Sequence, residues 1–440
     1  FNAAAPANGH AIYTLRSQAP SSTLPDLASQ KDGVIQINTG AATYQLDDKL
    51  MNLFPAGGLW WTRGDGRTFT FKIQGENAGI VLEENGPQRA AIKVTGWYVS
   101  ADESRPVAMG ELRFEFYRDQ SWFRLNHTVT YTGEPWSEKL GSYGAVFQFP
   151  GRTFTAASIE VDGKPLSHAK LISVNQTSEN QASITQGQKD TSTGQRAQGG
   201  SHLAGDKPAS IYLREAWKLF PKQIDADATR GQLTYHYWPK SAGAMAFVPR
   251  EDGWLPSSSS PEGLALGLSR TMELVIDPQG QFAADELPAQ FEQPVLAIVP
   301  PRYVCATGVI PDLQPYDPNK LPELERLIRE TIETYQLNQS LYGWYGHWVW
   351  GAVPNVFRSD ETRWADYGRY AHLLNEQNIT HGLWLAYLRS GDRMYYDFAR
   401  PYSRHVMEVG SIRWDDRWPD SVGLSRRHHE TIWLSAGDYG

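Results

Sequence analysis

Side chains that can transfer protons and bind carboxylates gather in the last hundred residues of the chain. This region contains six of the eleven histidines, namely His347, His372, His381, His405, His428 and His429. Together with tyrosine and arginine they suit β-elimination on a uronic acid. A cation or amide neutralises the carboxylate, a base removes the proton from the neighbouring carbon, and an acid protonates the departing glycosidic oxygen. This chemistry requires no metal and no cofactor.

Spacing along the chain selects candidates for such a site. His381 shares a helical face with Gln377 and Trp384, which favours a position on a cleft. The segment 342–350 carries more rings than an exposed loop usually does, unless those rings pack or stack on sugar. We therefore predict His381, Tyr345, His347, Arg426 and His428 as catalytic residues, and Tyr342, Trp348, Asn375, Trp384 and Arg427 as substrate-binding residues.

Each candidate also has a purely structural interpretation. His405 falls on the apolar stripe of a predicted helix, where a hydrogen-bonded core histidine is at least as common as a catalytic one. The rings of 342–350 can equally pack inside a core. The residues of 426–429 are adjacent, so they cannot all face the same way, and some of them are structural.

Composition narrows the classes of partner. The formal net charge of -8 does not indicate a basic surface for nucleic acid. For the same reason, an acidic polysaccharide would need a locally basic cleft. Aromatic residues make up 12% of the chain, which suits stacking on sugars as well as a large core.

Cys305 is the single cysteine, and no apolar run reaches the length of about 18 residues that a membrane span needs. Residues 1–10 do not resemble a signal peptide, although a leader could already have been removed, and we expect a secreted or periplasmic protein.

The first two thirds of the chain read as β-strands. Residues 111–117 alternate polar and apolar with Leu112, Phe114 and Phe116 inward, and 122–130 repeats the pattern after a turn at 119–120. Similar runs at 68–74, 90–99, 143–149, 231–238 and 263–276 predict a large antiparallel sandwich. The polar stretch 175–207 predicts either a long loop or short strands carrying an insertion.

After a proline-rich passage at 287–318, apolar residues recur every three or four positions, which is the spacing of a helix. Leu324, Leu327, Ile328, Ile332 and Tyr335 predict an amphipathic helix, and we expect helices to begin only near residue 321. A second helix is expected from about 365 to 389, and a third after Asp392, kinked at Pro401. The predicted domains are an N-terminal arm (1–34), a β-sandwich (35–290), a linker (291–320) and a partial α/α toroid (321–440).

Several strings, in this order and spacing, resemble the exo-acting rhamnogalacturonan lyases. They are ENGPQRAAIKV at 84–94, the strands of 113–127, WKLFPK at 217–222, YWP at 237–239, GLSRTME at 267–273, YGWYGH at 342–347, RWADY at 363–367, HGLWLAYLRSGD at 381–392, ARPYSRH at 399–405 and RRHH at 426–429. The resemblance implies a large antiparallel β-sandwich followed by the beginning of an α/α toroid. It also implies β-elimination on a polysaccharide that contains uronic acid and rhamnose, of the rhamnogalacturonan or ulvan type.

Two departures from the family and two other function classes remain open. The N-terminal barrel of the family is missing or reduced, and the toroid has about a third of its usual helices, so this chain is expected to be a fragment, inactive by itself or completed by self-association. Toroids also carry inverting hydrolases, whose paired carboxylates would come from Asp360, Glu361, Asp366 and Glu376. A non-catalytic sugar-binding or self-assembling extracellular protein is the third class.

Overall fold

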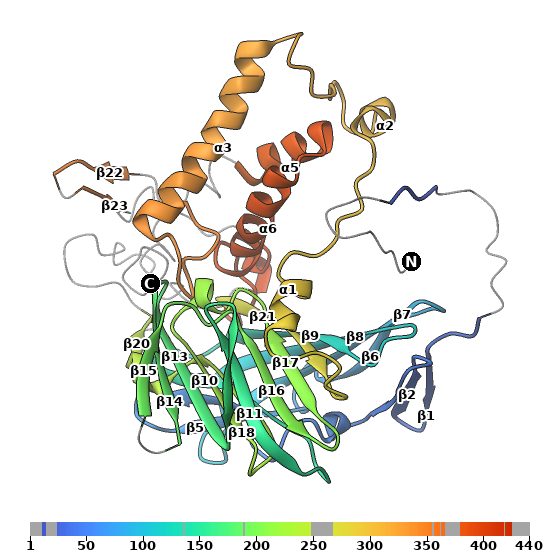
Figure 1. The fold of residues 1–440 in the computed structure, drawn as a ribbon, viewed down its shortest axis with the longest axis vertical. Coiled ribbons are helices and arrows are strands. Elements are labelled where there is room, and N and C mark those ends of the chain that lie inside the picture. The colour runs from blue at the N-terminus through green and yellow to red at the C-terminus, as the bar shows by residue number, and fades with distance from the viewer. Residues whose placement is uncertain are drawn as a thin grey trace.

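The alternating segments of the sequence form strands, and the helical period after them forms helices, in a computed structural model of the chain (Figure 1). The strands build the lower body of the molecule in Figure 1, and the helices stand above one end of it. The structure describes residues 11–14, 24–134, 137–187, 190–247, 267–353, 356–360, 362–365, 379–417 and 419–424.

Two antiparallel layers, which we call sheet 1 and sheet 2, make up the body. Sheet 1 contains, in spatial order, β12 (Lys164–Ala169), β11 (Phe154–Val161), β16 (Gly200–Gly205), β17 (Ala209–Leu213), β21 (Ser269–Asp277), β9 (Phe123–Tyr131), β8 (Ala108–Tyr117), β7 (Arg89–Val99) and β6 (Gly79–Asn85). Sheet 2 contains β5 (Thr68–Lys72), β4 (Leu59–Arg63), β10 (Lys139–Gln148), β19 (Gln232–Trp238), β18 (Lys222–Asp227), β13 (Leu171–Ser178), β14 (Gln181–Gln186) and β15 (Asp190–Gly194).

The two sheets face each other around one core. Strand β5 also pairs with β7, which joins the layers along one edge. Alternate residues of each strand point inward, and Leu112, Phe114 and Phe116 are fully buried as predicted. Short strands complete the β structure: β1 (Ala28–Lys31), β2 (Val34–Asn38) and β3 (Thr43–Leu46) form a small sheet, β20 (Met245–Ala246) pairs with β10, and β22 (Val356–Arg358) pairs with β23 (Arg363–Ala365).

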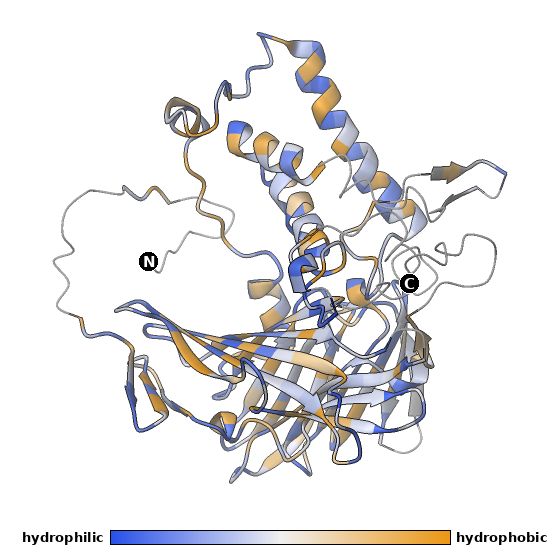
Figure 2. Ribbon diagram, turned by 180° about the vertical axis from the view of Figure 1, so that it is seen from behind, coloured by the Kyte–Doolittle hydropathy of each residue, from blue (hydrophilic) through white to orange (hydrophobic). Residues whose placement is uncertain are grey.

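The predicted antiparallel sandwich is confirmed. In the polar stretch 175–207, the alternative with short strands is the correct one, since β13 to β16 pass through it. Strand β1 forms within the range expected to be an N-terminal arm, and its first residue Ala28 and the preceding Leu27 belong to the main core. Apolar residues alternate with polar ones along the strands because one side of each strand faces the core (Figure 2).

The described residues form five α-helices: α1 (Glu286–Phe291), α2 (Pro301–Ala306), α3 (Pro322–Tyr342), α5 (Ile379–Ser390) and α6 (Arg393–Glu408). The expectation that helices begin only near residue 321 is wrong, because α1 and α2 precede it. Helix α1 forms where Leu287 covers Tyr212 and Val275 on the outer side of sheet 1. Of the helix expected from about 365, the described part is α5, while Ala365 itself lies in β23. No described helix has the length and hydropathy of a bilayer-spanning segment.

Helices α5 and α6 form the predicted antiparallel hairpin. Gly391 follows α5 with a φ of 70°, a left-handed conformation that ends the helix, and the Asp392 carboxylate accepts a hydrogen bond from the backbone amide of Met394. Pro401 lies inside α6 as expected. The apolar stripe of α6, on which His405 was expected, is buried: it comprises Tyr395, Phe398, Tyr402 and His405, and continues to Val409 directly after the helix.

Helix α3 has its apolar residues on two sides rather than one. Ile332 is buried against α5 and α6, but Leu324 and Leu327, which the period assigns to the same face, are about half exposed. Glu325 takes a buried position instead, because both of its carboxylate oxygens pair with the guanidinium of Arg389 on α5. Figure 2 shows apolar and polar patches interleaved around α3.

Candidate functional site at the junction of sandwich and helices

The loop after α3 connects the helices to the open end of the sandwich. It begins at Gly343, whose left-handed φ of 63° ends α3, and it runs to Val353. The backbone amides of Gly346 and His347 donate to the carbonyls of Lys218 (2.8 Å) and Phe220 (2.7 Å). These bonds fix the loop, which we call the junction loop, against the segment that precedes β18.

His347 lies in the junction loop with none of its surface exposed. Its Nε2 lies 2.7 Å from the Tyr143 hydroxyl and its Nδ1 lies 2.8 Å from Lys222 Nζ. Lys222 also donates to the carbonyls of Leu219 and Tyr237. Burial, followed by the charges of Lys222 and Arg270, lowers the pKa of His347 well below its usual value. His347 therefore remains neutral and holds the loop in the sandwich.

The aromatic rings of the junction loop pack beside it. Tyr345 lies between Trp217 and Trp350, with ring centroids 5.0 Å and 5.4 Å away. Trp348 is buried, and its Nε1 donates to the sulfur of Met245 at 3.1 Å. The interpretation of this segment as cleft-lining is not what the structure shows, because Tyr345 and Trp348, like His347, are interior residues. Their roles in catalysis and binding stay predictions, and direct contact with substrate would require the loop to leave the sandwich.

The remaining predicted residues lie apart from this core. Tyr342 is 37% exposed at the end of α3, next to the ring of Phe357. His381 is exposed on the first turn of α5. Trp384, one turn later, packs toward α6 and donates its Nε1 to the Ser403 hydroxyl at 2.8 Å. The predictions for Asn375, Arg426, Arg427 and His428 fall outside the described residues.

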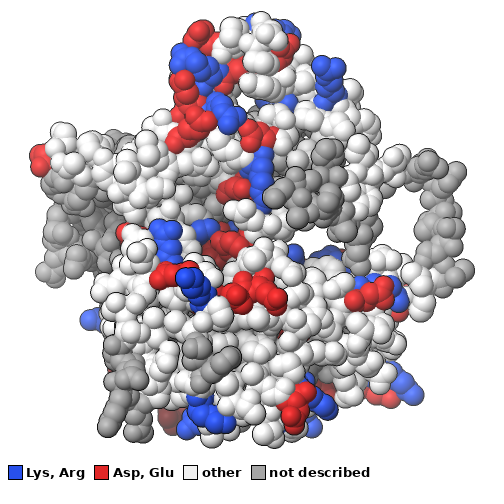
Figure 3. Space-filling model, viewed as in Figure 1, with Lys and Arg blue, Asp and Glu red and all other residues white. Residues whose placement is uncertain are grey.

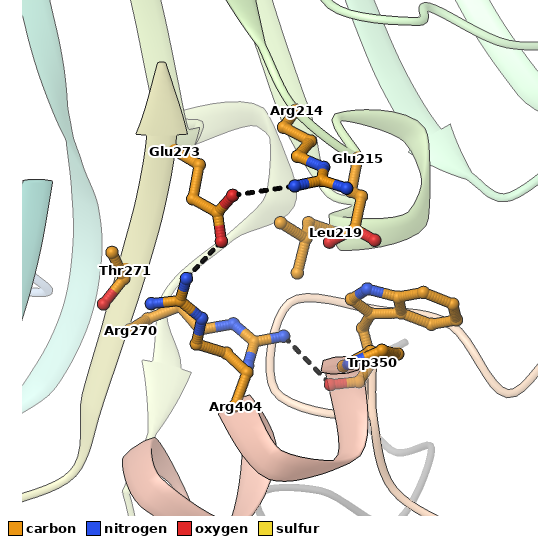
Figure 4. Close-up of a pocket in the computed structure, with 9 residues that line it drawn as sticks. Arg214, Glu215, Leu219, Arg270, Thr271, Glu273, Trp350 and Arg404 are labelled. Carbon is orange, nitrogen blue, oxygen red and sulfur yellow. Dashed lines mark hydrogen bonds and ion pairs between the residues drawn. The ribbon is translucent and has the colours of Figure 1, made fainter. Parts of the chain in front are cut away.

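Sequence reasoning missed a network of ion pairs that joins α6 to sheet 1. Glu273 on β21 pairs with Arg214 at 3.3 Å, with Arg400 at 3.4 Å and with Arg404. Figure 4 shows the Glu273 carboxylate between Arg214 and Arg404. Further pairs are Arg400 with Glu215, Lys218 with Glu292 at 2.8 Å, and Arg270 with Glu408 at 3.5 Å. The spacing of Arg400 and Arg404, one helical turn apart on α6, is the sequence signal that could have revealed this network.

Beside the network lies a small, partly open cavity of about 20 Å³. That space holds a water molecule but not a sugar ring. It is lined by Arg214, Glu215, Leu219, Arg270, Thr271, Glu273, Trp350, Pro401 and Arg404. The close approach of loop and helix depends on Gly351, because a side chain there would collide with the carbonyl of Pro401. The cavity is therefore part of the packing of the junction and not a substrate subsite.

The charges of the network largely cancel. Burial alone would raise the pKa of Glu273, but the arginines around it, led by Arg404, hold that pKa below its usual value. The pKa of Glu215 is likewise lowered by its cations, led by Arg400, against the effect of burial. Figure 3 shows basic and acidic side chains side by side where helices meet sandwich. These arginines are thus engaged by carboxylates of the chain itself and stabilise the junction.

Arg196 differs from these arginines, because the bonds it makes in the described structure go to neutral oxygens. Its Nε donates to the carbonyl of Glu179 (3.2 Å) and one terminal nitrogen donates to the side-chain oxygen of Asn180 (2.9 Å). The guanidinium carbon lies 3.9 Å from the ring centroid of Trp217, which holds it as a cation–π pair. Arg196 is partly exposed at the rim of the junction, so it can bind an external carboxylate.

The Arg196 rim lies next to the end of α3. The turn that carries Glu179 approaches Gly343, where an added Cβ would come within 3.0 Å of the Glu179 carboxylate. Gly343 directly follows the exposed Tyr342. The Glu179 turn therefore contacts Arg196 and also lies beside the end of α3.

Comparison with known proteins identifies two domains in the chain. Residues 60–155 match the model of the PcRGLX-like protein central beta sandwich domain, and residues 294–430 match that of the PcRGLX-like protein C-terminal alpha/alpha toroid domain. Together the matches cover more than half of the chain. An uncharacterized protein, YetA of Bacillus subtilis strain 168, is 25% identical over 261 residues, which are 54% of this chain and 29% of YetA. The chain thus spans less than a third of the length of this relative.

Solved structures give weaker likenesses. A galactose mutarotase related enzyme from Lactobacillus acidophilus is 12% identical and covers 57% of this chain and 96% of its own, with a TM-score of 0.25. An alpha-mannosidase from Enterococcus faecalis V583 is 10% identical and covers 57% of this chain and 29% of its own, with a TM-score of 0.28. These scores are well below 0.5, so the fold rests on the strand pairings and the family matches.

Proposed function

Because this chain belongs to the PcRGLX-like, rhamnogalacturonan lyase-like family through both its sandwich and its toroid domain, we propose that it acts in the cleavage of an acidic polysaccharide by β-elimination. The substrate would contain uronic acid and rhamnose, as rhamnogalacturonan and ulvan do. A substrate of this kind lies outside the cell, and a secreted or periplasmic location is part of the proposal.

In the proposed reaction, a base removes the proton from the carbon next to the uronate carboxylate. The bond to the glycosidic oxygen breaks, a carbon–carbon double bond remains in the sugar, and the leaving oxygen receives a proton. Charge develops on the carboxylate during proton removal, so a cation held against it lowers the barrier. The residues of the chain must therefore supply one free cation and a base.

The environment of Arg196 is the observation that supports this proposal best. Arg196 is partly exposed, it is held by neutral oxygens and by Trp217, and the Glu179 turn to which it is bonded also approaches Gly343 at the end of α3. A guanidinium in this state can bind both oxygens of a uronate carboxylate. We assign Arg196 to neutralisation of the carboxylate, and we retain His381 and Tyr342, both exposed, as the described candidates for proton transfer and binding.

Self-association stays a prediction within this proposal. It is motivated by the exposed leucines of α3, Leu324, Leu327, Leu337 and Leu341. Of the carboxylates that a hydrolase would use, Asp360 is exposed, and Glu361, Asp366 and Glu376 fall outside the described residues.

The decisive experiment incubates the full-length gene product with rhamnogalacturonan and with ulvan, and follows both ultraviolet absorbance and reducing ends. A lyase produces absorbance from the unsaturated uronyl product together with new ends. New ends without absorbance would replace the proposal with hydrolysis. Binding of polysaccharide with neither signal would replace it with a non-catalytic binding function.

A further inference from the structure

A second polar cluster lies on the outer face of sheet 2, on the side opposite to the core. The strand registers bring it together: Gly144 on β10 lies opposite both Trp60 on β4 and His236 on β19. Across the next strands, Gln223 pairs with His236 and Ser173 pairs with Asp225. We call Trp60, Ser173, Gln223, Asp225 and His236 the outer-face cluster.

Asp225 is the centre of the outer-face cluster. Its Oδ1 accepts hydrogen bonds from the Ser173 hydroxyl (2.5 Å) and from Gln223 Nε2 (2.9 Å), and its Oδ2 lies 2.8 Å from His236 Nε2. Burial alone would raise the pKa of Asp225, but its hydrogen bonds, led by that of His236, lower it. The carboxylate is therefore ionised and holds the proton of His236 on Nε2.

This arrangement orients His236 toward a ligand. With Nε2 donating to Asp225, Nδ1 of the neutral ring is the nitrogen that accepts a hydrogen bond. The side chains of His236 and Asp225 are 24% and 25% exposed, so both reach the surface.

Trp60 supplies an aromatic surface beside them. Its indole lies across Gly144, where an added Cβ would come within 2.6 Å of the ring. The ring centroid is 5.3 Å from that of His236, at an interplanar angle of 75°. Trp60 is partly exposed, so the glycine lets an indole lie along the sheet with one side toward the backbone and the other toward solvent.

An aromatic plane next to oriented hydrogen-bonding groups is the arrangement that binds a sugar ring. The apolar side of the sugar covers the indole, and its hydroxyls bond to the imidazole, the hydroxyl of Ser173 and the amide of Gln223. The cluster has an ionised carboxylate and contains no lysine or arginine. It therefore favours a neutral sugar and disfavours a uronate, in contrast to Arg196 at the junction.

We propose that the outer-face cluster is a binding site for a neutral sugar unit, stacked on Trp60 and hydrogen-bonded to the Asp225–His236 pair. This proposal does not depend on the β-elimination proposed above. It gives the sandwich a second contact with a polysaccharide, on a different face from the junction.

The test measures binding of methyl α-rhamnoside, methyl β-galactoside and galacturonate to the chain by saturation-transfer NMR and calorimetry. We expect at least one of the two neutral glycosides to bind and galacturonate to bind more weakly or not at all. Asp225→Asn removes the charge and one of the two oxygens that accept from Ser173, Gln223 and His236, so the dissociation constant of the variant should rise about tenfold. Trp60→Ala should remove detectable binding, and Trp60→Phe should retain part of it.

Asp227→Asn is the matched control. Asp227 lies two residues away on β18, on the same face, and caps its own turn at Thr229 and Arg230. Its variant should bind as the unchanged chain does, and thermal unfolding of every variant should match that of the chain. The proposal is overturned if neither neutral glycoside binds, if galacturonate binds more tightly, or if folded Asp225→Asn and Asp227→Asn variants bind equally well.

Discussion

Lys222 Nζ lies 2.8 Å from His347 Nδ1, and both side chains are almost completely buried where the junction loop enters the sandwich. Burial, followed by the charge of Arg270, lowers the pKa of Lys222 well below its usual value. The pair therefore joins the helices to the sandwich through hydrogen bonds. Loss of either side chain should destabilise the folded chain, because the remaining polar group would stay buried.

The first prediction concerns this pair. His347→Ala leaves Lys222 and the Tyr143 hydroxyl without their partner and opens a cavity, so it should lower the free energy of unfolding by about 2–4 kcal/mol. Equilibrium denaturation measures the change. His381→Ala, on the exposed side of α5, is the matched control and should change stability by less than about 0.5 kcal/mol. Equal effects of the two variants would contradict the structural role of His347.

The second prediction concerns acid stability. Burial lowers the pKa of His127, between the hydroxyls of Tyr98 (2.9 Å) and Tyr237 (3.4 Å), to about 3. The unfolded state binds a proton near pH 6.5 and the folded state does not, so this histidine makes stability fall as pH decreases from about 6.5 toward 3. The slope from this group approaches about 1.4 kcal/mol per pH unit.

Denaturation curves from pH 7 to pH 4 measure this slope. His127→Gln cannot take up a proton, so its stability should depend less on pH than that of the unchanged chain, even if it is less stable at pH 7. A His127→Gln variant with an unchanged slope would contradict the buried, neutral state of His127.

The third prediction concerns the ion pairs between α6 and sheet 1. Glu273→Gln leaves Arg214, Arg400 and Arg404 with less negative charge around them, so it should destabilise the chain by about 2–4 kcal/mol. Hydrogen exchange should increase in α6 before it increases in the sandwich strands. Glu323→Gln, which breaks an exposed pair with Arg326 on α3, should cost less than about 0.5 kcal/mol.

Periodicity predicted the parts of this fold that a single element determines. The alternation of β8 and the stripe of α6 depend only on which side of a strand or helix is apolar, and both are correct in the structure. The end of α5 and the start of α6 followed from Gly391 and Asp392, which act within the same short segment, whereas the expected start near residue 365 lies in β23. Helix α1 was missed because it is short and is stabilised by a contact of Leu287 with sheet 1 that lies far away in sequence.

The site was harder to predict because the type of a residue does not show whether its side chain is buried in the core or exposed at the surface. His347 and Trp348 have the chemistry of a sugar-binding cleft, but their neighbours Tyr143, Lys222 and Met245 come from distant strands and bury them. Leu324 and Leu327 show the same limit on α3, where the Glu325–Arg389 pair determines the buried side. Arg196 and Glu273 gave no local signal, since partners such as Trp217 and Arg404 come from elements that are distant in sequence.

The fourth prediction concerns the proposed function. If Arg196 neutralises the uronate carboxylate, Arg196→Ala should lower kcat/KM of the full-length gene product by about 10- to 100-fold, because a charged hydrogen-bonded pair contributes about 1.5–3 kcal/mol. Arg196→Lys keeps the charge but cannot bond both oxygens, so its activity should lie between the two. The rate is measured from the absorbance of the unsaturated product.

Arg230→Ala is the control for this prediction. It removes an arginine that is 76% exposed in the turn between β18 and β19, and it should be as active as the unchanged protein. Full activity in a folded Arg196→Ala variant would remove Arg196 from the proposed site.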